Sequence, residues 1–552
     1  MRFFLLLIGM LSLAFASCSG EVSHYIPAVV GDDGDLVQVT MSLAQGSGDT
    51  YVTITPKIGV STQKSIEDAI TYAKKASNSN ENCNVYVNFP DKGGNLIEGP
   101  SGGASFSIMA YSLFKNIELR EDTMITGTVD IFGNVGAVGG LYEKAKGAST
   151  IGAKYFITPE EDLYETFLLK DLKEQLNLTV LQAKSMDEII GFVFYNETIE
   201  EVELSSKKRE IPEVPYYNYS NMKEFEKVAE RMIDLEEQLV ANITANDNET
   251  AIIKSFFENE VLRQNAILEK GYLFTAANEA FLNYIDLWTI YATIEGNVDL
   301  DEKVDDISEC LGDIERPTIT DSNFQWVIGA DLRQNWAQNK LENTEIDNLL
   351  EEEKYIAYND IMYAQAWCEV AKGLLNSTNE SGNKIDESEW KDIAERKLNE
   401  ASNIQSLESN LEDRLEIAEE AFQDGEYGAA IYDAVFVIVQ SEDVLDNVSL
   451  SIVNETRNSL WGNVYQSHAA YFYTQNQTSL AYRTARLAKE LDLITTEMEG
   501  KMKIIEIEEE ISQCYAPIVV GMAFLFIVIV IITKRRSHGT NGPRYRKTHR
   551  IK

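Results

Sequence analysis

Histidine is scarce in this sequence, with four residues among 552. His538 and His549 lie near the C-terminus, which leaves His24 and His468 in the body of the chain. A Ser–His–Asp triad would therefore depend on one of two isolated residues, each more typical of a structural histidine. There is no H-E-x-x-H motif, and histidines spread this widely predict no zinc site by local spacing.

Basic residues are also few. The chain has 48 Lys and Arg against 89 Asp and Glu, a formal net charge of −41. This charge argues against a nucleic-acid-binding surface and favours a strongly solvated exterior, with an acidic funnel for basic substrates as the alternative. The phosphate-loop pattern G-x-x-x-x-G-K-[ST] is missing, so no nucleotide site is predicted. The five cysteines are too scattered for a metal cluster, although Cys310 and Cys368 could form a disulfide in an oxidising compartment.

Both ends of the chain carry targeting patterns. Residues 1–17 combine a basic start, an apolar stretch and an A-x-A pattern, which is typical of a signal peptide, and Cys18 just beyond it could instead carry a lipid. Residues 515–533 are 19 uncharged residues, enough to span a bilayer, and residues 534–552 form a basic tail with eight Lys or Arg. Ten N-x-S/T sequons support export. We expect a single-pass membrane protein with extracytoplasmic domains and a cytoplasmic tail.

Two regions with different predicted secondary structure lie between these ends. Residues 24–195 alternate strand-like and helix-like segments, which predicts an α+β domain, with a hairpin joining strands at 35–44 and 50–59 and a helix over 161–176. A proline-containing linker over 196–220 precedes a mostly helical region over 221–513. Its segment 418–439 resembles one tetratricopeptide unit without a clear repeat. The Trp and Tyr residues of this region are expected in its core rather than in a ligand cage.

The stretch "IEGPSGGASF" places Ser101 in a Pro- and Gly-lined elbow before a helix-like run. The elbow fits a tight turn with a serine cap, or a nucleophile at a helix N-terminus. With histidine scarce, a lysine is the remaining base. Helical spacing puts Lys144 on an apolar stripe with Leu141, Ala145 and Ala148. Burial would lower its pKa, which must fall by about 3 units for a base near neutrality. The alternative is a buried stem whose ammonium reaches water.

The motifs EGPSGGAS, ITG, GNV, GGLYEK and ITPEED follow one another in order at the spacing of a known family. Over roughly residues 24–194 the chain resembles the proteolytic domain of Lon-type serine–lysine peptidases. The resemblance implies an α+β Lon-type proteolytic domain, here followed by the helical region and the expected transmembrane helix. It also implies Ser101 as nucleophile and Lys144 as general base, and neither a metal nor a cofactor.

The same resemblance assigns supporting roles to other positions. Thr126 matches a threonine that helps to hold the lysine, and Glu98 a carboxylate near the site. Backbone groups at Gly102 and Gly103 could form an oxyanion hole. Thr128 stands where bacterial members have Glu, and Tyr142 where they have Lys, which bears on specificity and rate more than on reaction type.

No ATPase module accompanies these motifs. We therefore expect an ATP-independent endopeptidase that acts on unfolded or flexible extracytoplasmic proteins or peptides. Family members form rings, so this chain could be a homo-oligomer. The helical region would bind or orient substrate, gate access or mediate assembly. The alternatives are an inactive Lon-type domain used as a cell-surface binding or structural protein, and a peptidase restricted to itself or to one partner.

Overall fold

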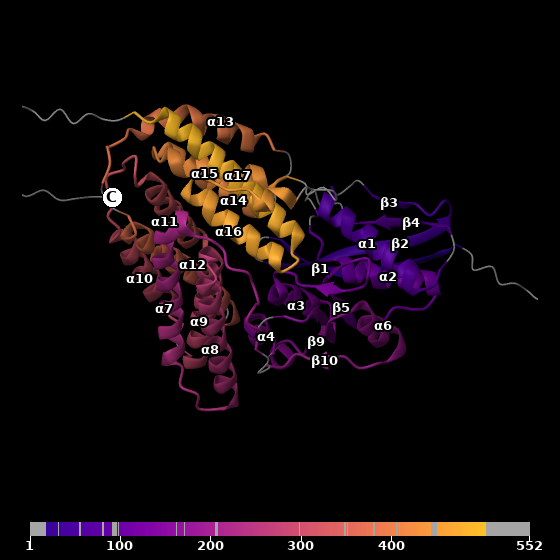
Figure 1. Cartoon of the computed structure of the whole chain (residues 1–552). Coiled ribbons are helices and arrows are strands. Elements are labelled where there is room, and N and C mark those ends of the chain that lie inside the picture. The colour runs from indigo at the N-terminus through magenta and orange to yellow at the C-terminus, as the bar shows by residue number, and fades with distance from the viewer. Residues whose placement is uncertain are drawn as a thin grey trace, which may run out of the picture.

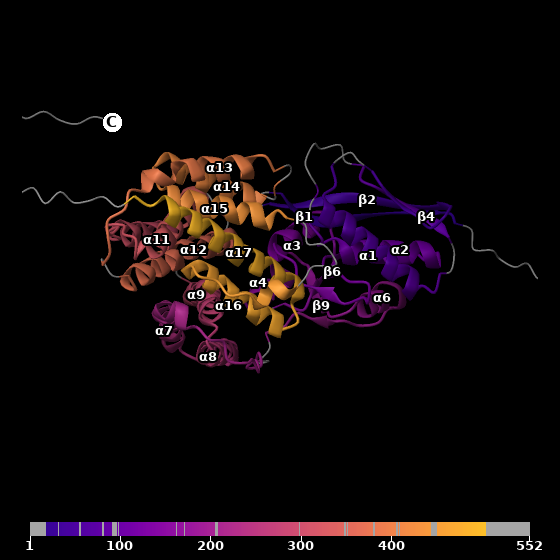
Figure 2. The same ribbon diagram turned by 45° about the horizontal axis from the view of Figure 1, so that its top comes forward.

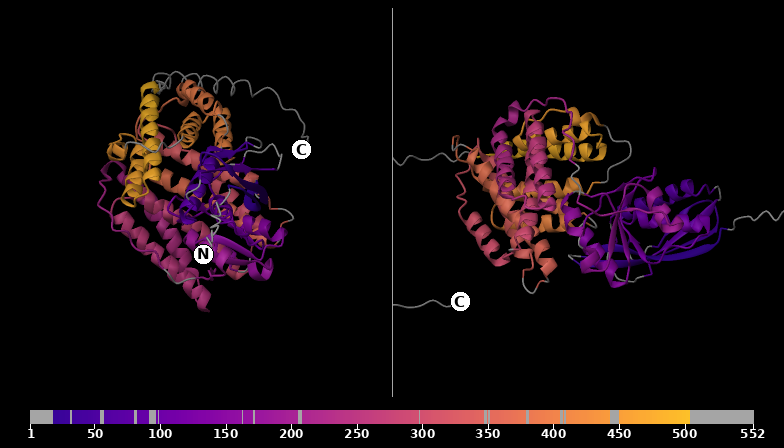
Figure 3. Two further views of the ribbon diagram at one scale, coloured as in Figure 1. Left: turned by 90° about the vertical axis from the view of Figure 1, so that its right-hand side faces the viewer. Right: turned by 90° about the horizontal axis from the view of Figure 1, so that it is seen from below.

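The computed structural model describes residues 18–503 except 31–32, 54–56, 80–81, 91–96, 98, 162, 171, 205–207, 297, 347–348, 350, 379–380, 405–406, 408 and 443–449. The chain forms two lobes (Figure 1). An α/β lobe contains the strands, and a helical lobe follows it in the sequence. Viewed from below, in the right panel of Figure 3, the two lobes lie side by side and meet along one edge.

The first sheet of the α/β lobe has the order β1-β2-β4-β3. Its strands are β1 (Gly20–Val30), β2 (Asp33–Gln45), β3 (Thr50–Val52) and β4 (Cys83–Asn88). The expected hairpin between β2 and β3 is wrong, because β4 lies between them, antiparallel to β2 and parallel to β3. The Asn84 side chain of β4 explains this arrangement. Its Oδ1 accepts hydrogen bonds from the backbone N–H groups of residues 47, 48 and 49, at 2.9, 3.0 and 3.1 Å, so the connecting loop wraps around β4.

The second sheet has the order β10-β9-β8-β5, and a small hairpin pairs β6 with β7. Strands β5, β8 and β9 are parallel, so their carboxyl ends share one edge. The bounds of these strands are β5 (Thr123–Ile125), β6 (Thr128–Val129), β7 (Val135–Gly136), β8 (Tyr155–Pro159), β9 (Thr179–Ala183) and β10 (Glu200–Glu201).

Helices cover both faces of this second sheet. Ile125 of β5 belongs to a core shared with α1 and α2, whereas Met124 of the same strand belongs to a core shared with α3. The helix expected over 161–176 is divided into α4 and α5. The helices of this lobe are α1 (Val60–Ala76), α2 (Gly103–Lys115), α3 (Leu141–Thr150), α4 (Leu163–Leu169), α5 (Leu172–Gln175) and α6 (Met186–Tyr195).

The helical lobe buries its apolar faces in a large common core that includes Trp390 and Trp461, which are 0% and 2% exposed. Long helices run in pairs, such as α16 beside α17 (Figure 2). The lobe consists of α7 (Glu226–Asn242), α8 (Asn248–Glu269), α9 (Leu273–Glu295), α10 (Leu300–Gly312), α11 (Phe324–Asn343), α12 (Glu351–Asn376), α13 (Lys391–Ser402), α14 (Ser409–Gln423), α15 (Tyr427–Gln440), α16 (Leu460–Thr474) and α17 (Thr478–Lys501), with 3₁₀ turns η1 (Ser220–Phe225), η2 (Glu387–Trp390) and η3 (Leu450–Asn454).

Helix α4 joins the two lobes. Its Leu163 and Phe167 are buried in a cluster that otherwise comes from α7 to α12 of the helical lobe. Lys170, directly after α4, forms an ion pair with Glu249 of α8. In Figure 1, α4 accordingly lies where the two lobes meet. Since α4 follows β8, the helical lobe packs next to the carboxyl edge of the second sheet.

Two disulfides cross-link the described residues. The expected bond between Cys310 and Cys368 is present. Cys18 is bonded to Cys83 of β4, which corrects the alternative of a lipid on Cys18, since a thioether and a disulfide cannot share one sulfur. The disulfide ties the start of the described chain to an inner strand of the first sheet.

The expectation of a single-pass membrane protein is corrected by the helices of the structure. Among residues 18–503, with the gaps given above, no helix has both the length and the apolar character needed to cross a bilayer. The expected transmembrane segment 515–533, the signal peptide 1–17 and the basic tail 534–552 lie outside the described residues.

The buried Glu236 of α7 generates a prediction about pH and stability. Burial, together with the nearby charge of Glu260, raises the pKa of Glu236 well above its usual value. The folded chain therefore holds a proton that the unfolded chain has released, so this group destabilises the fold increasingly as pH rises above about 4.3. We expect Glu236→Gln to raise the unfolding midpoint measured by calorimetry, by roughly 2–4 °C at pH 8 and by less at pH 5.

The exposed neighbour Glu237 provides the control. Glu237→Gln should change the unfolding midpoint little at either pH. An equal gain at both pH values for Glu236→Gln, or no gain, would contradict the assignment of a buried, proton-binding carboxyl.

Candidate active site

Ser101 lies in the turn that leads into α2, and backbone hydrogen bonds attach this turn to the residues after β5. The N–H of Gly127 donates to the carbonyl of Ser101 at 2.9 Å, and the N–H of Ala104 donates to the carbonyl of Gly127 at 3.0 Å. Gly99 has a φ of +112°, which favours glycine at the entrance to the turn. Ser101 is half-buried. The elbow is thus held at the carboxyl end of β5.

The two glycines after Ser101 allow this close packing. A Cβ on Gly103 would lie 2.9 Å from the backbone N of Val129, and one on Gly102 would lie 2.8 Å from the ring of Phe106. Their N–H groups differ. Gly103 donates to the carbonyl of Pro100 at 3.1 Å, whereas within the described part of the chain the N–H of Gly102 has no acceptor. Of the two expected oxyanion donors, Gly102 is the one that is available in this structure.

Lys144 lies one turn into α3 and is 5% exposed. Its neighbours on the apolar stripe, Leu141, Ala145 and Ala148, are buried as well, so the expected burial of this face is confirmed. The amine donates a hydrogen bond to the carbonyl of Gly139 at 2.6 Å. Burial lowers the pKa of Lys144 to about 8, against the opposing effect of nearby glutamates.

Ser101 and Lys144 reach the same edge of the second sheet from opposite faces. Ser101 is bonded to the residues that follow β5, and α2 lies on that face. Lys144 interacts electrostatically with Glu161 and Glu165, which follow β8, and α3 lies on the other face. The parallel pairing of Ile125 with Ile157 aligns the two strand ends. The topology therefore brings residues 43 positions apart in the sequence to one edge.

The side chains of Ser101 and Lys144 are not hydrogen-bonded to each other in the structure, where the amine is engaged by Gly139. Thr126, which the family resemblance associates with the lysine, is fully buried and donates its hydroxyl to the carbonyl of Ser101 at 3.3 Å. Thr126 therefore positions the elbow. Glu98 lies outside the described residues.

The carbonyl of Gly139 and the glutamates after β8 were not identified from the sequence. The pair Gly139–Gly140 directly before α3 was the available signal, since Gly140 has a φ of +64° that turns the chain into the helix. This turn places the Gly139 carbonyl above the first turn of α3, where a lysine one turn along can reach it.

The described chain contains two histidines, one in each lobe. His24 is in β1, paired with Val39, and burial lowers its pKa to about 4. His468 is in α16 of the helical lobe and is hydrogen-bonded to Thr275 at 2.9 Å. Among the described residues, no group of histidine, cysteine and acidic side chains could hold a metal ion.

Comparisons with known proteins place the α/β lobe in a family. Residues 23–196 match the family model of the Lon protease (S16) C-terminal proteolytic domain. Lon protease 2 of Herpetosiphon aurantiacus is 28% identical over 179 residues, which cover 30% of this chain and 21% of the relative. Lon protease of Fusobacterium nucleatum is 31% identical over 156 residues, 27% of this chain and 20% of the relative. Archaeal Lon protease of Methanocaldococcus jannaschii is 33% identical over 113 residues, which cover 20% of this chain and 16% of the relative. The chain spans about a fifth of the length of these curated relatives.

The buried amine generates a prediction about stability. Burial lowers the pKa of Lys144 from 10.5 to about 8, so the folded state binds this proton less tightly than the unfolded state. Below pH 8, where the side chain is charged in both states, this lowers the free energy of unfolding by ~3 kcal/mol. The penalty decreases as pH rises and is gone near pH 10.5. We expect Lys144→Met, which keeps the apolar stem, to raise the free energy of unfolding at pH 7 by up to ~3 kcal/mol, and by less at pH 9.5. Lys146→Met on the half-buried side of α3 is the control, and an equal gain there would contradict the assignment.

Proposed function

We propose that this chain is a serine peptidase, on the premise that residues 23–196 form a Lon-type proteolytic domain. Ser101 is the nucleophile and Lys144 is the general base of a Ser–Lys dyad. The observation that carries the proposal is the lysine amine held 5% exposed with its pKa lowered to about 8, at the strand edge where the Ser101 elbow is attached.

The reaction follows from the groups at this edge. The neutral amine of Lys144 removes the proton of the Ser101 hydroxyl as its oxygen attacks the carbonyl carbon of a peptide bond. The N–H of Gly102 stabilises the oxyanion of the tetrahedral intermediate. The intermediate collapses to an acyl-enzyme, and the Lys144 ammonium returns the proton to the leaving amine. Lys144 then removes a proton from a water molecule that attacks the acyl carbon, and its ammonium returns that proton to the Ser101 oxygen as the carboxylic acid product leaves.

The hydrogen bond from Lys144 to Gly139 is compatible with this role. A neutral amine has one lone pair and two N–H groups, so it can donate to the Gly139 carbonyl while its lone pair accepts the serine proton. Thr126 and Gly127 hold the carbonyl of Ser101, which leaves the hydroxyl as the group of this residue that can turn toward the amine.

We further propose that cleavage needs no ATP and acts on unfolded or flexible polypeptides. The sequence contains no phosphate loop, and the helical lobe packs against α4 next to the site, where it can bind or orient a chain before cleavage. By family resemblance, Glu98 supplies an additional carboxylate near the site. The chain could assemble as a homo-oligomer, as the family resemblance suggests.

The first test is cleavage of a fluorescently labelled unfolded casein by the purified chain in the absence of ATP. We expect steady cleavage by the wild type and a loss of at least about a thousandfold in Ser101→Ala, which lacks the attacking oxygen. Ser112→Ala, at the far end of the same helix, should cleave normally. A folded wild type that does not cleave, or a Ser101→Ala variant that does, would refute the proposal; the first result would favour a scaffold or a dedicated-partner role.

The lysine generates a separate prediction about pH. Because the neutral amine is the active form, the rate of Ser101 labelling by a fluorophosphonate should rise with pH and level off above a midpoint of about 8. Lys144→Met should react about 100- to 10,000-fold more slowly and without this midpoint. Lys146→Met should keep both rate and midpoint. A midpoint that survives in Lys144→Met would assign the base to another group.

A further inference from the structure

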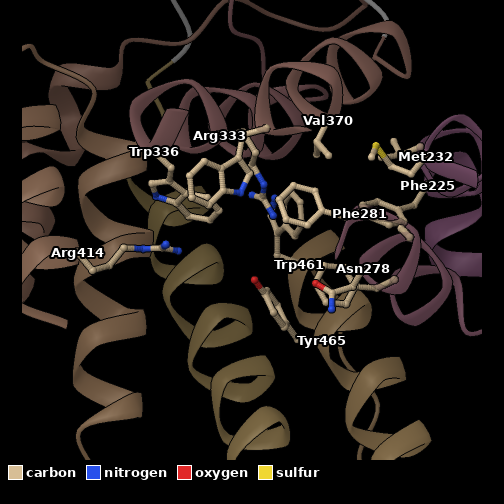
Figure 4. Close-up of a pocket in the computed structure, with 14 residues that line it drawn as sticks. Phe225, Met232, Asn278, Phe281, Arg333, Trp336, Val370, Arg414, Trp461 and Tyr465 are labelled. Carbon is tan, nitrogen blue, oxygen red and sulfur yellow. The ribbon is translucent and has the colours of Figure 1, made fainter. Parts of the chain in front are cut away.

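The helical lobe contains a cavity of about 170 Å³ between α7, α9, α11, α12, α14 and α16. Its walls are aromatic, and its polar lining consists of Arg333, Arg414, Asn278 and the phenol of Tyr465 (Figure 4). The side chains of Arg333, Arg414 and Tyr465 point toward a common space from three different helices (Figure 4). Phe281, Trp367 and Tyr465 in its wall are half-buried, so part of each side chain is accessible to solvent.

Arg333 is 7% exposed and has no carboxylate in ion-pair distance among the described residues. One guanidinium nitrogen donates to the carbonyl of Gly329 in its own helix at 3.2 Å. The guanidinium group lies 4.7 Å from the ring centres of both Trp336 and Trp461. Arginine stays charged in proteins, and a charge this deeply buried is normally paired. The two indoles offset part of the lost hydration, and the phenol of Tyr465 also forms a hydrogen bond with the guanidinium group. The remaining N–H groups can donate to an acceptor from outside.

Arg414 does not balance this charge. Its guanidinium group lies over Trp336 at 3.5 Å and donates to Asp433 at 2.6 Å. Asp433 also accepts a hydrogen bond from the indole of Trp336 at 2.9 Å. Two guanidinium groups therefore share one carboxylate, which leaves an excess of one positive charge at the cavity. A monoanionic ligand would balance this local excess.

We propose that this cavity binds a carboxylate carried on an apolar or aromatic body, with Arg333 as its partner. The planar guanidinium fork matches a carboxylate in geometry, and the aromatic walls accept an apolar side chain. A cavity of this size holds a group about as large as one amino-acid side chain, not a folded segment. This chemistry is shared by the C-terminal residue of a polypeptide and by a small free acid.

The polypeptide end is the source that fits the rest of the molecule, and this choice rests on the proposed peptidase function. The ring of Phe281 in the cavity wall lies edge-on to the ring of Tyr363, with the ring centres 6.0 Å apart. Tyr363 in turn lies within electrostatic range of Tyr164 in α4, the helix that joins the lobes beside the candidate site. A chain held by its end in the cavity would thus start in the lobe that adjoins the peptidase edge.

The test uses the full chain carrying Ser101→Ala, so that binding is measured without cleavage and independently of whether the wild type is active. The probe is a fluorescent decapeptide ending in Leu-Phe, with either a free carboxylate or an amide at its C-terminus, and the readout is fluorescence anisotropy. We expect the acid to bind at least tenfold more tightly than the amide. Equal binding of both on this unaltered cavity would overturn the proposal, whatever any cavity variant does.

Variants and a competitor complete the design. Arg333→Met should lose at least tenfold in affinity for the acid and little for the amide, whereas Arg396→Met, an exposed arginine of α13, should change neither. Unchanged acid binding by a folded Arg333→Met would overturn the proposal. N-acetyl-phenylalanine should compete weakly. If it binds more tightly than the peptide acid, the carboxylate site stands but the polypeptide end is overturned as its source.

Discussion

A lysine side chain that is 5% exposed loses most of the water that would stabilise its ammonium form, and the rest of the candidate site depends on how the fold supports that loss. The apolar stripe of α3, with Leu141, Ala145 and Ala148, is buried in a core shared with the second sheet. Lys144 lies on the same stripe and is buried with it. One carbonyl, that of Gly139, receives its N–H, and the result is an amine with a pKa of about 8.

The elbow of Ser101 is held by a different kind of interaction. Backbone hydrogen bonds from Gly127 and to Gly127 fix the turn to the end of β5, and the buried hydroxyl of Thr126 adds a third bond. Helix packing on one face of the sheet buries Lys144, and backbone hydrogen bonds on the other face hold Ser101. These two interactions do not depend on each other. The parallel alignment of β5 with β8 is what makes them converge, because it puts both strand ends at one edge.

Each lobe contains a buried basic side chain, and burial affects the two kinds of side chain differently. An amine exposed to the same loss of water releases its proton and becomes a base, whereas a guanidinium group keeps its proton and remains a cation. This difference underlies the two proposed roles, proton transfer for Lys144 in the α/β lobe and anion binding for Arg333 in the helical lobe. Helix α4, with Leu163 and Phe167 packed into the helical lobe, connects the surroundings of both.

The features that depend on local sequence patterns could be predicted from the sequence. The position of Ser101 before a helix and of Lys144 on an apolar stripe follows from the 3.6-residue period of a helix, which the sequence states directly. The resemblance of ordered motifs identified the Lon-type domain, and the pairing of Cys310 with Cys368 was anticipated. The role of Glu98 stays a prediction, and both Glu98 and the chain ends lie outside the described residues.

The features that depend on contacts between distant segments were decided by the tertiary structure. It inserted β4 between β2 and β3, because Asn84 binds the loop that local pattern alone predicts to be a hairpin turn. Cys18 is bonded to Cys83, a pairing that the sequence did not indicate. The hydroxyl of Thr126 binds the carbonyl of Ser101 and not the lysine. The tertiary structure also gathered Arg333, Arg414 and three tryptophans around one cavity. The sequence by itself determined which faces are apolar and where the turn before the helix lies; only packing between distant segments decided which of those faces meet, because no local pattern encodes a contact across hundreds of residues.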